Sequence, residues 1–423
     1  MGGRDREIAV FADWEGLSGA QRMGTLHAVA GRGKEDFRFE YDRAWLARED
    51  CLALDPELQL FDGPQYPAEQ RANFGVFLDS SPDRWGRLLM RRREEREARK
   101  AERAPAKLTE SDYLLGVHDQ HRIGALRFKR EADGPFLDDR VELAAPPMAR
   151  LRELENASLK LEESGAEERP DYDRWLKMLI APGGSLGGAR PKASVLDADG
   201  SLWIAKFPSR NDQGDLGGWE KVVHDLAQRA GVATSEARAR RFNTKWHAFL
   251  TRRFDRTERG QRIHFASAMT LLGRADGDDH STGASYLHLA EFLVRNGART
   301  NADLEQLWRR MLFFMCVSNC DDHLRNHGFL QLPGEGWVLA PAFDMNPDPE
   351  ADGLLLNISE SDNAQSLDLA REVAPLFRVK EPRAAKIVAE VRAAVKDWRK
   401  LADATGLTRA EQERMARAFR LAI

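Results

Sequence analysis

Three polar side chains in the last third of the sequence have the types and spacing that phosphoryl transfer requires. Asp321 and Asn326 stand five positions apart in SNCDDHLRNHGFL, and Asp344 follows in PAFDMNP. In kinases an aspartate takes the proton of the attacking hydroxyl, an asparagine five residues later helps to hold Mg²⁺, and a downstream aspartate bridges metal and phosphates. Magnesium prefers oxygen ligands of this kind. The spacing therefore predicts a phosphotransferase site that uses Mg²⁺.

A glycine-rich segment upstream could bind the phosphates of a nucleotide. The residues APGGSLGGARPKASV, at 181–195, enter an alternating apolar run, and DADGS followed by LWIAKFPS completes a predicted β-hairpin. Glycine lets the backbone approach phosphate oxygens closely and turn N–H groups toward an anion. The segment is not GxGxxGxV, and the sequence contains neither HRD nor DFG. These differences disfavour an ordinary eukaryotic-type protein kinase.

Lys206 lies on the second predicted strand of this hairpin, between apolar neighbours in LWIAKFP. A lysine in such surroundings needs a partner, and kinases provide the nucleotide phosphates and a helix glutamate. Glu220, in GGWEKVVHDLAQRAG, is the candidate glutamate, because a periodic apolar pattern predicts a helix there that ends at Gly231. The alternative interpretation of Lys206 is an edge-strand lysine that faces water.

In this order the motifs resemble the HipA family of bacterial serine/threonine protein kinases, the toxins of HipBA-type toxin–antitoxin modules. The resemblance runs over nearly the whole chain and rests on SLGGARPKASV, AKFPS, TRRFDRT, SNCDDHLRNHGFL and PAFDMNP, with RIGALRF and FGVFLDSSPDRWGRLLMRR nearer the N-terminus. It implies an α+β fold that is two-lobed and protein-kinase-like, of the HipA type, with a mixed N-terminal subdomain and a mostly helical C-terminal lobe. Ser318 and Cys320 depart from the usual Gly and Thr, and Arg252 stands where the hinge often has Glu.

The resemblance also implies a role for each matching residue. Asp321 would be the catalytic base and Lys206 the phosphate-pairing lysine, with Glu220 as its structural partner, while Asn326 and Asp344 would hold Mg²⁺. The residues expected around ATP are Gly187, Gly188, Ala189, Arg190, Pro191, Lys192, Lys206, the hinge Arg252, Arg253 and Phe254, and His323, Asn326, Phe343 and Asp344.

Ser185 matches a serine that such kinases autophosphorylate. A phosphoserine would repel ATP from the same loop, because it carries about −1.5 to −2 charge at neutral pH. From the residues alone, a serine in a Gly-Ser turn is the ordinary interpretation.

The implied activity is that of an ATP- and Mg²⁺-dependent serine/threonine protein kinase, the toxin of a bacterial type II toxin–antitoxin system. Its expected substrate is an aminoacyl-tRNA synthetase, of the glutamyl type by analogy. The expected partner is a HipB-like helix-turn-helix antitoxin, so that DNA would be bound only indirectly. Two alternatives stay open: a small-molecule phosphotransferase on the same fold, and a catalytically idle co-repressor subunit that acts through the antitoxin.

Two other metal sites are weaker interpretations. The run DDH at 321–323 lacks further His or Cys at the spacing of zinc ligands. The run at 275–283 lacks the final Glu of a calcium loop and is better interpreted as an acidic surface loop.

Composition is consistent with a cytoplasmic globular protein of two or more domains. The chain has 423 residues, of which 42% are hydrophobic and 31% charged. No apolar run reaches the length of a membrane span, and the opening residues lack the apolar core of a signal peptide. The three cysteines predict no disulfide framework. A net charge of −4 disfavours direct binding of nucleic acid.

The elements that must position these residues fall into three predicted segments: an N-terminal α/β subdomain of the HipA type at 1–150, a kinase N-lobe with the glycine-rich loop and strand lysine at 151–260, and a helical C-lobe with the catalytic and metal-binding loops at 261–423. Within the first, alternation at 37–41 predicts a strand, and Ser81 with Pro82 predicts a helix start. Within the last, residues 301–320 predict an amphipathic helix that ends at the catalytic loop, and Thr408 with Glu411 predicts a capping box.

Overall fold

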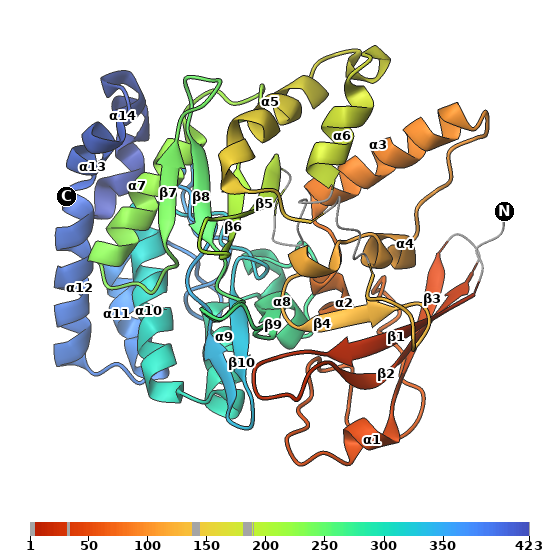
Figure 1. Ribbon diagram of the computed structural model, residues 1–423. Coiled ribbons are helices and arrows are strands. Elements are labelled where there is room, and N and C mark those ends of the chain that lie inside the picture. Colours follow the sequence, from red (N-terminus) through yellow and green to blue (C-terminus); the bar gives the residue numbers. More distant parts are fainter. Residues whose placement is uncertain (1–4, 32–33, 138–143, 181–187, 189, 423) are drawn as a thin grey trace. The chain divides into compact units, whose positions relative to one another are not determined.

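The computed structural model describes residues 5–31, 34–137, 144–180, 188 and 190–422, which form two compact units (Figure 1). Unit 1 comprises Met1–Arg210 and Asp255–Ala266, and unit 2 comprises Asn211–Phe254 and Ser267–Ile423. The expected boundary near residue 150 does not coincide with this division, because residues 151–210 belong to the same compact unit as the N-terminal residues. The three functional segments stay a prediction.

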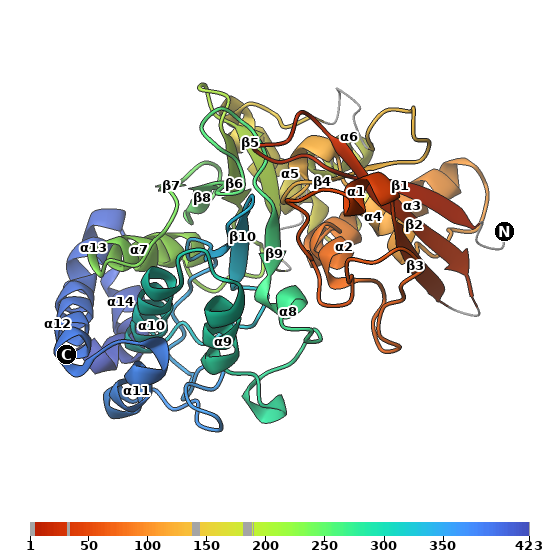
Figure 2. The same ribbon diagram turned by 90° about the horizontal axis from the view of Figure 1, so that it is seen from below.

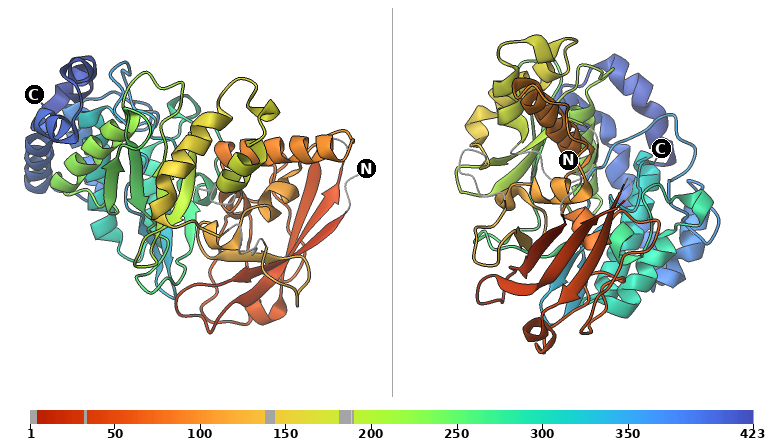
Figure 3. Two further views of the ribbon diagram at one scale, coloured as in Figure 1. Left: turned by 45° about the horizontal axis from the view of Figure 1, so that its top comes forward. Right: turned by 90° about the vertical axis from the view of Figure 1, so that its right-hand side faces the viewer.

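Unit 1 contains a four-stranded antiparallel sheet in the order β3-β2-β1-β4. Its strands are β1 (Arg6–Ala12), β2 (Gln21–Ala30), β3 (Glu35–Tyr41) and β4 (Leu126–Lys129). The alternation predicted for the third strand is confirmed, because Phe37, Phe39 and Tyr41 are buried between less buried neighbours. The helices of this unit are α1 (Arg43–Leu46), α2 (Gly75–Asp79), α3 (Arg84–Lys100), α4 (Glu110–Leu115), α5 (Leu151–Leu161) and α6 (Tyr172–Ile180). Helices α3 and α6 lie side by side (Figure 3).

The start of α3 differs from the predicted one. Asp83, not Ser81, is the N-cap, and its Oδ1 accepts a hydrogen bond from the Gly86 backbone N–H at 2.8 Å. Ser81 lies two residues before this N-cap, and its hydroxyl donates back to the carbonyl oxygen of Phe77 at 2.8 Å. A carboxylate at the N-cap satisfies an otherwise unpaired N–H and also faces the positive end of the helix dipole.

The hairpin predicted from the glycine-rich segment is confirmed within unit 1. Strand β5 (Lys192–Leu196) pairs antiparallel with β6 (Leu202–Lys206). Their turn contains Gly200, whose φ of 81° lies in the left-handed region that favours glycine. The register places Lys192 directly opposite Lys206.

Unit 2 is mostly helical, as predicted (Figure 2). Its helices are α7 (Leu216–Arg229), α8 (Ala268–Leu271), α9 (Tyr286–Asn296), α10 (Thr300–Val317), α11 (Leu367–Val373), α12 (Glu381–Lys396), α13 (Trp398–Thr405) and α14 (Arg409–Met415). Its hairpins join β7 (Ala237–Arg240) to β8 (Ala248–Arg252) and β10 (Gly328–Leu332) to β11 (Gly336–Leu339), while β9 (Phe265–Ser267) crosses the division. Helix α7 ends before Gly231 and the capping box of Thr408 and Glu411 starts α14, so both predictions are confirmed.

Helix α10 forms the core of unit 2 and carries the chain to the catalytic loop. Its buried residues include the predicted apolar face: Leu304, Leu307, Trp308, Met311, Leu312 and Met315. Helices α9 and α12 pack against it. No helix in the described ranges combines the length and apolarity that a bilayer crossing demands.

Candidate functional site

The predicted catalytic loop begins where α10 ends. Ser318 caps α10 with φ 49° and ψ 47°, a left-handed conformation that costs a non-glycine residue about 1–2 kcal/mol. Glycine would adopt this conformation without that cost. The Ser318 hydroxyl donates to the carbonyl oxygen of Ala418 at 2.9 Å. The loop therefore leaves a rigid helix at a defined angle.

Asn319 joins this loop to the segment that carries Asp344. Its side-chain Oδ1 accepts a hydrogen bond from the backbone N–H of Asn346 at 2.7 Å. The side chain of Asn346 in turn donates to Oδ1 of Asp344 at 3.2 Å. Asp344 has a φ of 55°, which is unusual for an aspartate and is a feature that clusters at functional sites. Within unit 2 the structure thus connects two of the predicted motifs.

Asn326 is fixed in the way that a metal ligand requires. Its Nδ2 donates to the carbonyl oxygen of Asp321 at 2.8 Å, and its backbone N–H donates to that of His323, also at 2.8 Å. Its Oδ1 is buried and has no hydrogen-bond partner among the described residues. A buried oxygen of this kind is unfavourable unless something binds it, and a hard cation such as Mg²⁺ fits.

The adjacent residues Asp321 and Asp322 differ in burial. Asp321 is exposed, whereas Asp322 is fully buried. Oδ2 of Asp322 accepts a hydrogen bond from the Tyr286 hydroxyl at 2.6 Å, and Oδ1 accepts one from the Leu355 backbone N–H at 2.8 Å. Burial raises the pKa of Asp322 to about 7. The carboxylate of Asp321 lies at the surface, while that of Asp322 holds the loop.

The predicted hinge residues lie at the end of β8. The backbone N–H of Arg252 donates to the carbonyl oxygen of Glu236 at 2.9 Å, and Arg253 is buried. The rings of Phe254 and Phe343 pack with their centroids 5.5 Å apart. These two predicted nucleotide-binding residues, distant in the sequence, are therefore neighbours within unit 2.

The predicted lysine and glutamate belong to different units. Lys206 is the last residue of β6 in unit 1 and is partly buried. Glu220 lies on α7 in unit 2 and is buried. Their pairing stays a prediction.

The glycine-rich segment is described only at its C-terminal end. Ser185, Gly187 and Ala189 lie outside the described residues. The backbone N–H of Phe207 donates to the carbonyl oxygen of Pro191 at 2.8 Å. The carbonyl oxygen of Phe207 accepts a hydrogen bond from the Arg190 guanidinium at 3.2 Å. The end of the segment is thereby held against the residue that follows Lys206.

Lys192, at the end of this segment, is buried. Its ammonium group donates to Oδ2 of Asp83 at 2.7 Å. It also donates to the carbonyl oxygen of Gly188 at 3.3 Å. No local pattern predicts the contact with Asp83, because the two residues are 109 positions apart.

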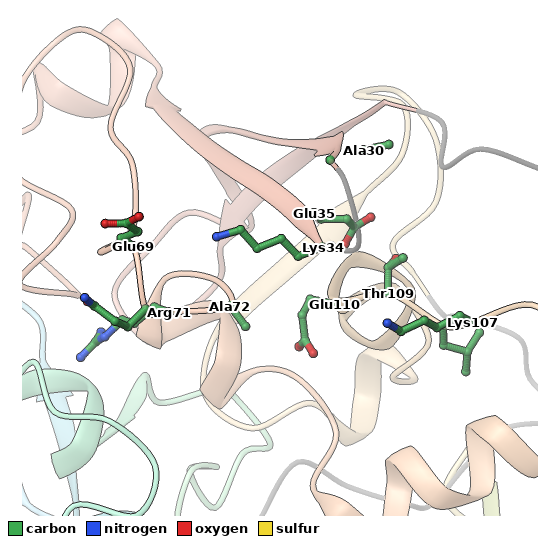
Figure 4. A pocket seen from close by; sticks show the side chains of 12 residues that line it. Ala30, Lys34, Glu35, Glu69, Arg71, Ala72, Lys107, Thr109 and Glu110 are labelled. Carbon is green, nitrogen blue, oxygen red and sulfur yellow. The ribbon is translucent and has the colours of Figure 1, made fainter.

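A pocket of about 530 Å³ lies in unit 1, and none of the predicted site residues lines it (Figure 4). Its wall comes from the ends of β2 and β3, residues 69–72 and residues 107–110. Two of its carboxylates are already bound within the fold: Glu35 accepts from the Ser111 hydroxyl at 2.6 Å, and Glu110 binds Arg87 at 2.7 Å. The pocket therefore adds no catalytic group to the site.

Comparisons with known proteins bear on the family and the fold of the chain. A family model described as the HipA-like C-terminal domain matches residues 184–398. A curated Haemophilus influenzae protein named "Putative kinase" is 29% identical over 116 residues, which are 26% of this chain and 34% of that protein. The chain thus matches about a third of that relative's length.

Two solved structures are similar to this chain. One is HipA of Shewanella oneidensis MR-1, in a complex with HipB and operator DNA, with a TM-score of 0.65 and 15% identity over 98% of this chain and 95% of that one. The other is the proinflammatory kinase CtkA of Helicobacter pylori, with a TM-score of 0.40 and 13% identity over 56% of this chain and 87% of that one. The likeness to HipA confirms the predicted α+β, kinase-like fold of the HipA type.

Proposed function

Because the chain belongs to the HipA family, whose C-terminal domain model covers half of it, we propose that it is an ATP- and Mg²⁺-dependent serine/threonine protein kinase. The observation that best supports this activity concerns Asn326. Its Oδ1 is buried and has no hydrogen-bond partner among the described residues. Its loop is hydrogen-bonded through Asn319 to the segment that carries Asp344. A carboxylate and a carboxamide on two segments joined in this way supply oxygen ligands of the kind that Mg²⁺ prefers.

In the proposed mechanism each side chain has one task. Asp321, exposed and anchored through its carbonyl oxygen by Asn326, accepts the proton of the substrate hydroxyl. Asn326 and Asp344 hold Mg²⁺, which when bound neutralises charge on the phosphates. Lys206 pairs with the α- and β-phosphates and is oriented by Glu220. Catalysis of this type depends on positioning, which the rigid end of α10 provides.

The nucleotide-binding residues complete the proposal. We place Gly187, Gly188, Ala189, Arg190 and Pro191 around the phosphates, with Lys192 at the end of the same segment, and the hinge Arg252, Arg253 and Phe254 beside the adenine. The packed rings of Phe254 and Phe343 support an apolar surface there. His323 lies in the same loop as Asn326 and would line the site.

The family also suggests a biological role. We propose that the chain is the toxin of a type II toxin–antitoxin pair, that it phosphorylates an aminoacyl-tRNA synthetase of the glutamyl type, and that it autophosphorylates Ser185. The Shewanella HipA structure, which contains HipB and operator DNA, supports a HipB-like helix-turn-helix antitoxin as partner. Contact with DNA would then be indirect.

The direct test is transfer of label from [γ-³²P]ATP. The purified chain, its Asp321→Asn and Asp344→Ala variants, and an Asp368→Ala control are incubated with Mg²⁺ and cell lysate. Asp368 suits the control because its side chain is 94% exposed in the same unit. We expect wild type and control to label protein, and both site variants to lose at least about a hundredfold while their unfolding midpoints stay unchanged.

The other outcomes identify the alternatives. Label on a metabolite instead of protein would favour a small-molecule phosphotransferase. Growth arrest by overexpressed Asp321→Asn equal to that by wild type would favour the idle co-repressor. Equal labelling by wild type and Asp344→Ala would reject the kinase.

A further inference from the structure

A buried ion pair in unit 1 joins the start of β5 to the start of α3. The Lys192 ammonium lies 2.7 Å from Oδ2 of Asp83, and the two side chains are 3% and 1% exposed. The other oxygen of Asp83 caps α3 at Gly86. One carboxylate therefore completes a helix and neutralises a buried lysine, and losing it would leave a buried charge without its counter-ion.

Lys192 also faces Lys206 across the hairpin. The two are directly opposite in the antiparallel register, so their side chains leave the same face of the β5–β6 pair. Like charges at opposite positions repel. Asp83 offsets this repulsion at Lys192, while Lys206 is the cation that the proposed function assigns to the phosphates.

The same ammonium reaches the glycine-rich segment. It donates to the carbonyl oxygen of Gly188 at 3.3 Å, where the backbone has a φ of 87°. Together with the contacts of Arg190 and Pro191 to Phe207, this fastens the described end of the segment to both α3 and the strand of Lys206. Asp83 is the group that fixes the ammonium in this network.

We propose that Asp83 is a positioning residue of the nucleotide site. It holds Lys192, and through Lys192 it sets the position of Gly188 and of the strand opposite Lys206. Lys192 serves as the anchor and does not itself bind the phosphates, which replaces the role expected from its motif. This proposal rests on the proposed function, and it gives the N-terminal part of the chain a role in nucleotide affinity without contact to the nucleotide.

A double-mutant cycle separates an anchor from a phosphate ligand. Asp83→Asn keeps an N-cap acceptor and removes only the charge, and Lys192→Met keeps the length of the side chain. Affinity for adenylyl imidodiphosphate with Mg²⁺ is measured by calorimetry for wild type, both single variants and the double variant, alongside the unfolding midpoint. We expect each single change to weaken affinity about tenfold and the double change to weaken it about tenfold as well, because both act on one ion pair.

Two further variants serve as controls. Glu57→Gln removes the charge from another largely buried ion pair of unit 1, that of Glu57 with Arg71, and is expected to leave the affinity unchanged. Lys192→Arg preserves the charge opposite Asp83 and should bind within about twofold of wild type, which keeps the test valid if a neutral variant fails to fold.

Three outcomes would overturn the proposal. In the first, the double variant binds the analogue about a hundredfold more weakly than wild type. In the second, Lys192→Met weakens the affinity and Asp83→Asn does not. In the third, all variants bind the analogue like wild type. The first two would assign Lys192 to the phosphates. Failure of the wild type itself to bind the analogue would instead overturn the proposed function, and with it the site that Asp83 is argued to position.

Discussion

The hydroxyl of Tyr286 donates a 2.6 Å hydrogen bond to the carboxylate of Asp322, the residue after the proposed catalytic base. This contact ties the catalytic loop to the first turn of α9. The backbone N–H of Leu355 binds the other oxygen of the carboxylate, so two segments hold Asp322 from the buried side. Asp321 consequently faces outward on a short, fixed loop.

Removing the Tyr286 hydroxyl should destabilise the protein without disturbing the ring. Tyr286→Phe keeps the edge-on packing against His327, whose ring centroid is 5.2 Å away. We expect the free energy of unfolding to fall by about 1–3 kcal/mol, because a buried carboxylate loses one of its donors. Denaturant unfolding measures this. The control Tyr172→Phe, at a buried tyrosine of unit 1, should change less. A Tyr286→Phe variant as stable as wild type would contradict the role given to this bond.

The stability contributed by Asp322 should depend on pH. Burial raises its pKa to about 7 in the folded protein, whereas an unfolded aspartate has a pKa of about 3.9. Between about pH 4 and pH 7 Asp322 is protonated in the folded state and ionised in the unfolded state. Its contribution to the free energy of unfolding is therefore complete below about pH 4 and disappears as pH rises toward 7. Asp322→Asn should therefore become more stable relative to wild type from pH 5 to pH 7.5. Parallel pH profiles would contradict this.

His264 should give the opposite slope. Its side chain is 2% exposed, and burial lowers its pKa to about 3. Below about pH 6.5 an unfolded histidine, whose pKa is about 6.5, is protonated, whereas the buried His264 stays neutral. The contribution of His264 to the free energy of unfolding is therefore complete above about pH 6.5 and is lost as pH falls. His264→Phe should flatten the decline in unfolding free energy between pH 6.5 and pH 4. If the free energy of unfolding of the variant declines below about pH 6.5 as steeply as that of wild type, His264 does not cause the decline.

The amide of Asn326 should control the metal requirement. Asn326→Ala removes the proposed ligand oxygen and the hydrogen bond to the Asp321 carbonyl. We expect the Mg²⁺ concentration for half-maximal phosphoryl transfer to rise at least about tenfold, because a lost ligand weakens a site with few protein donors. A Mg²⁺ titration measures this, with Asn301→Ala, whose side chain binds only Arg378 among the described residues, as control. Identical titration curves would exclude Asn326 as a ligand.

The sequence allowed prediction of the elements whose signals are local. Alternation and a turn identified the hairpin of Lys206, and a capping pair identified the start of α14 at Thr408. The start of α3 was misplaced by two residues because Ser81 is an equally good cap by type. Only the fold reveals that its hydroxyl is already bonded to Phe77.

The two contacts that hold the site could not be predicted. Asp83 and Lys192 are 109 positions apart, and Tyr286 and Asp322 are 36 apart. Neither pair has a periodic or motif signal, because each is created by tertiary packing that buries both partners. The chemistry-bearing residues are recognisable from spacing, whereas the residues that position them are not.

The most direct test of the account is a structure of the chain bound to adenylyl imidodiphosphate and Mg²⁺. We predict that the side chains of Asn326 and Asp344 coordinate the metal and that the Lys206 ammonium contacts the α- or β-phosphate of the same nucleotide. A bound nucleotide that contacts Asp344 while Lys206 lies too far away to reach its phosphates would contradict the account.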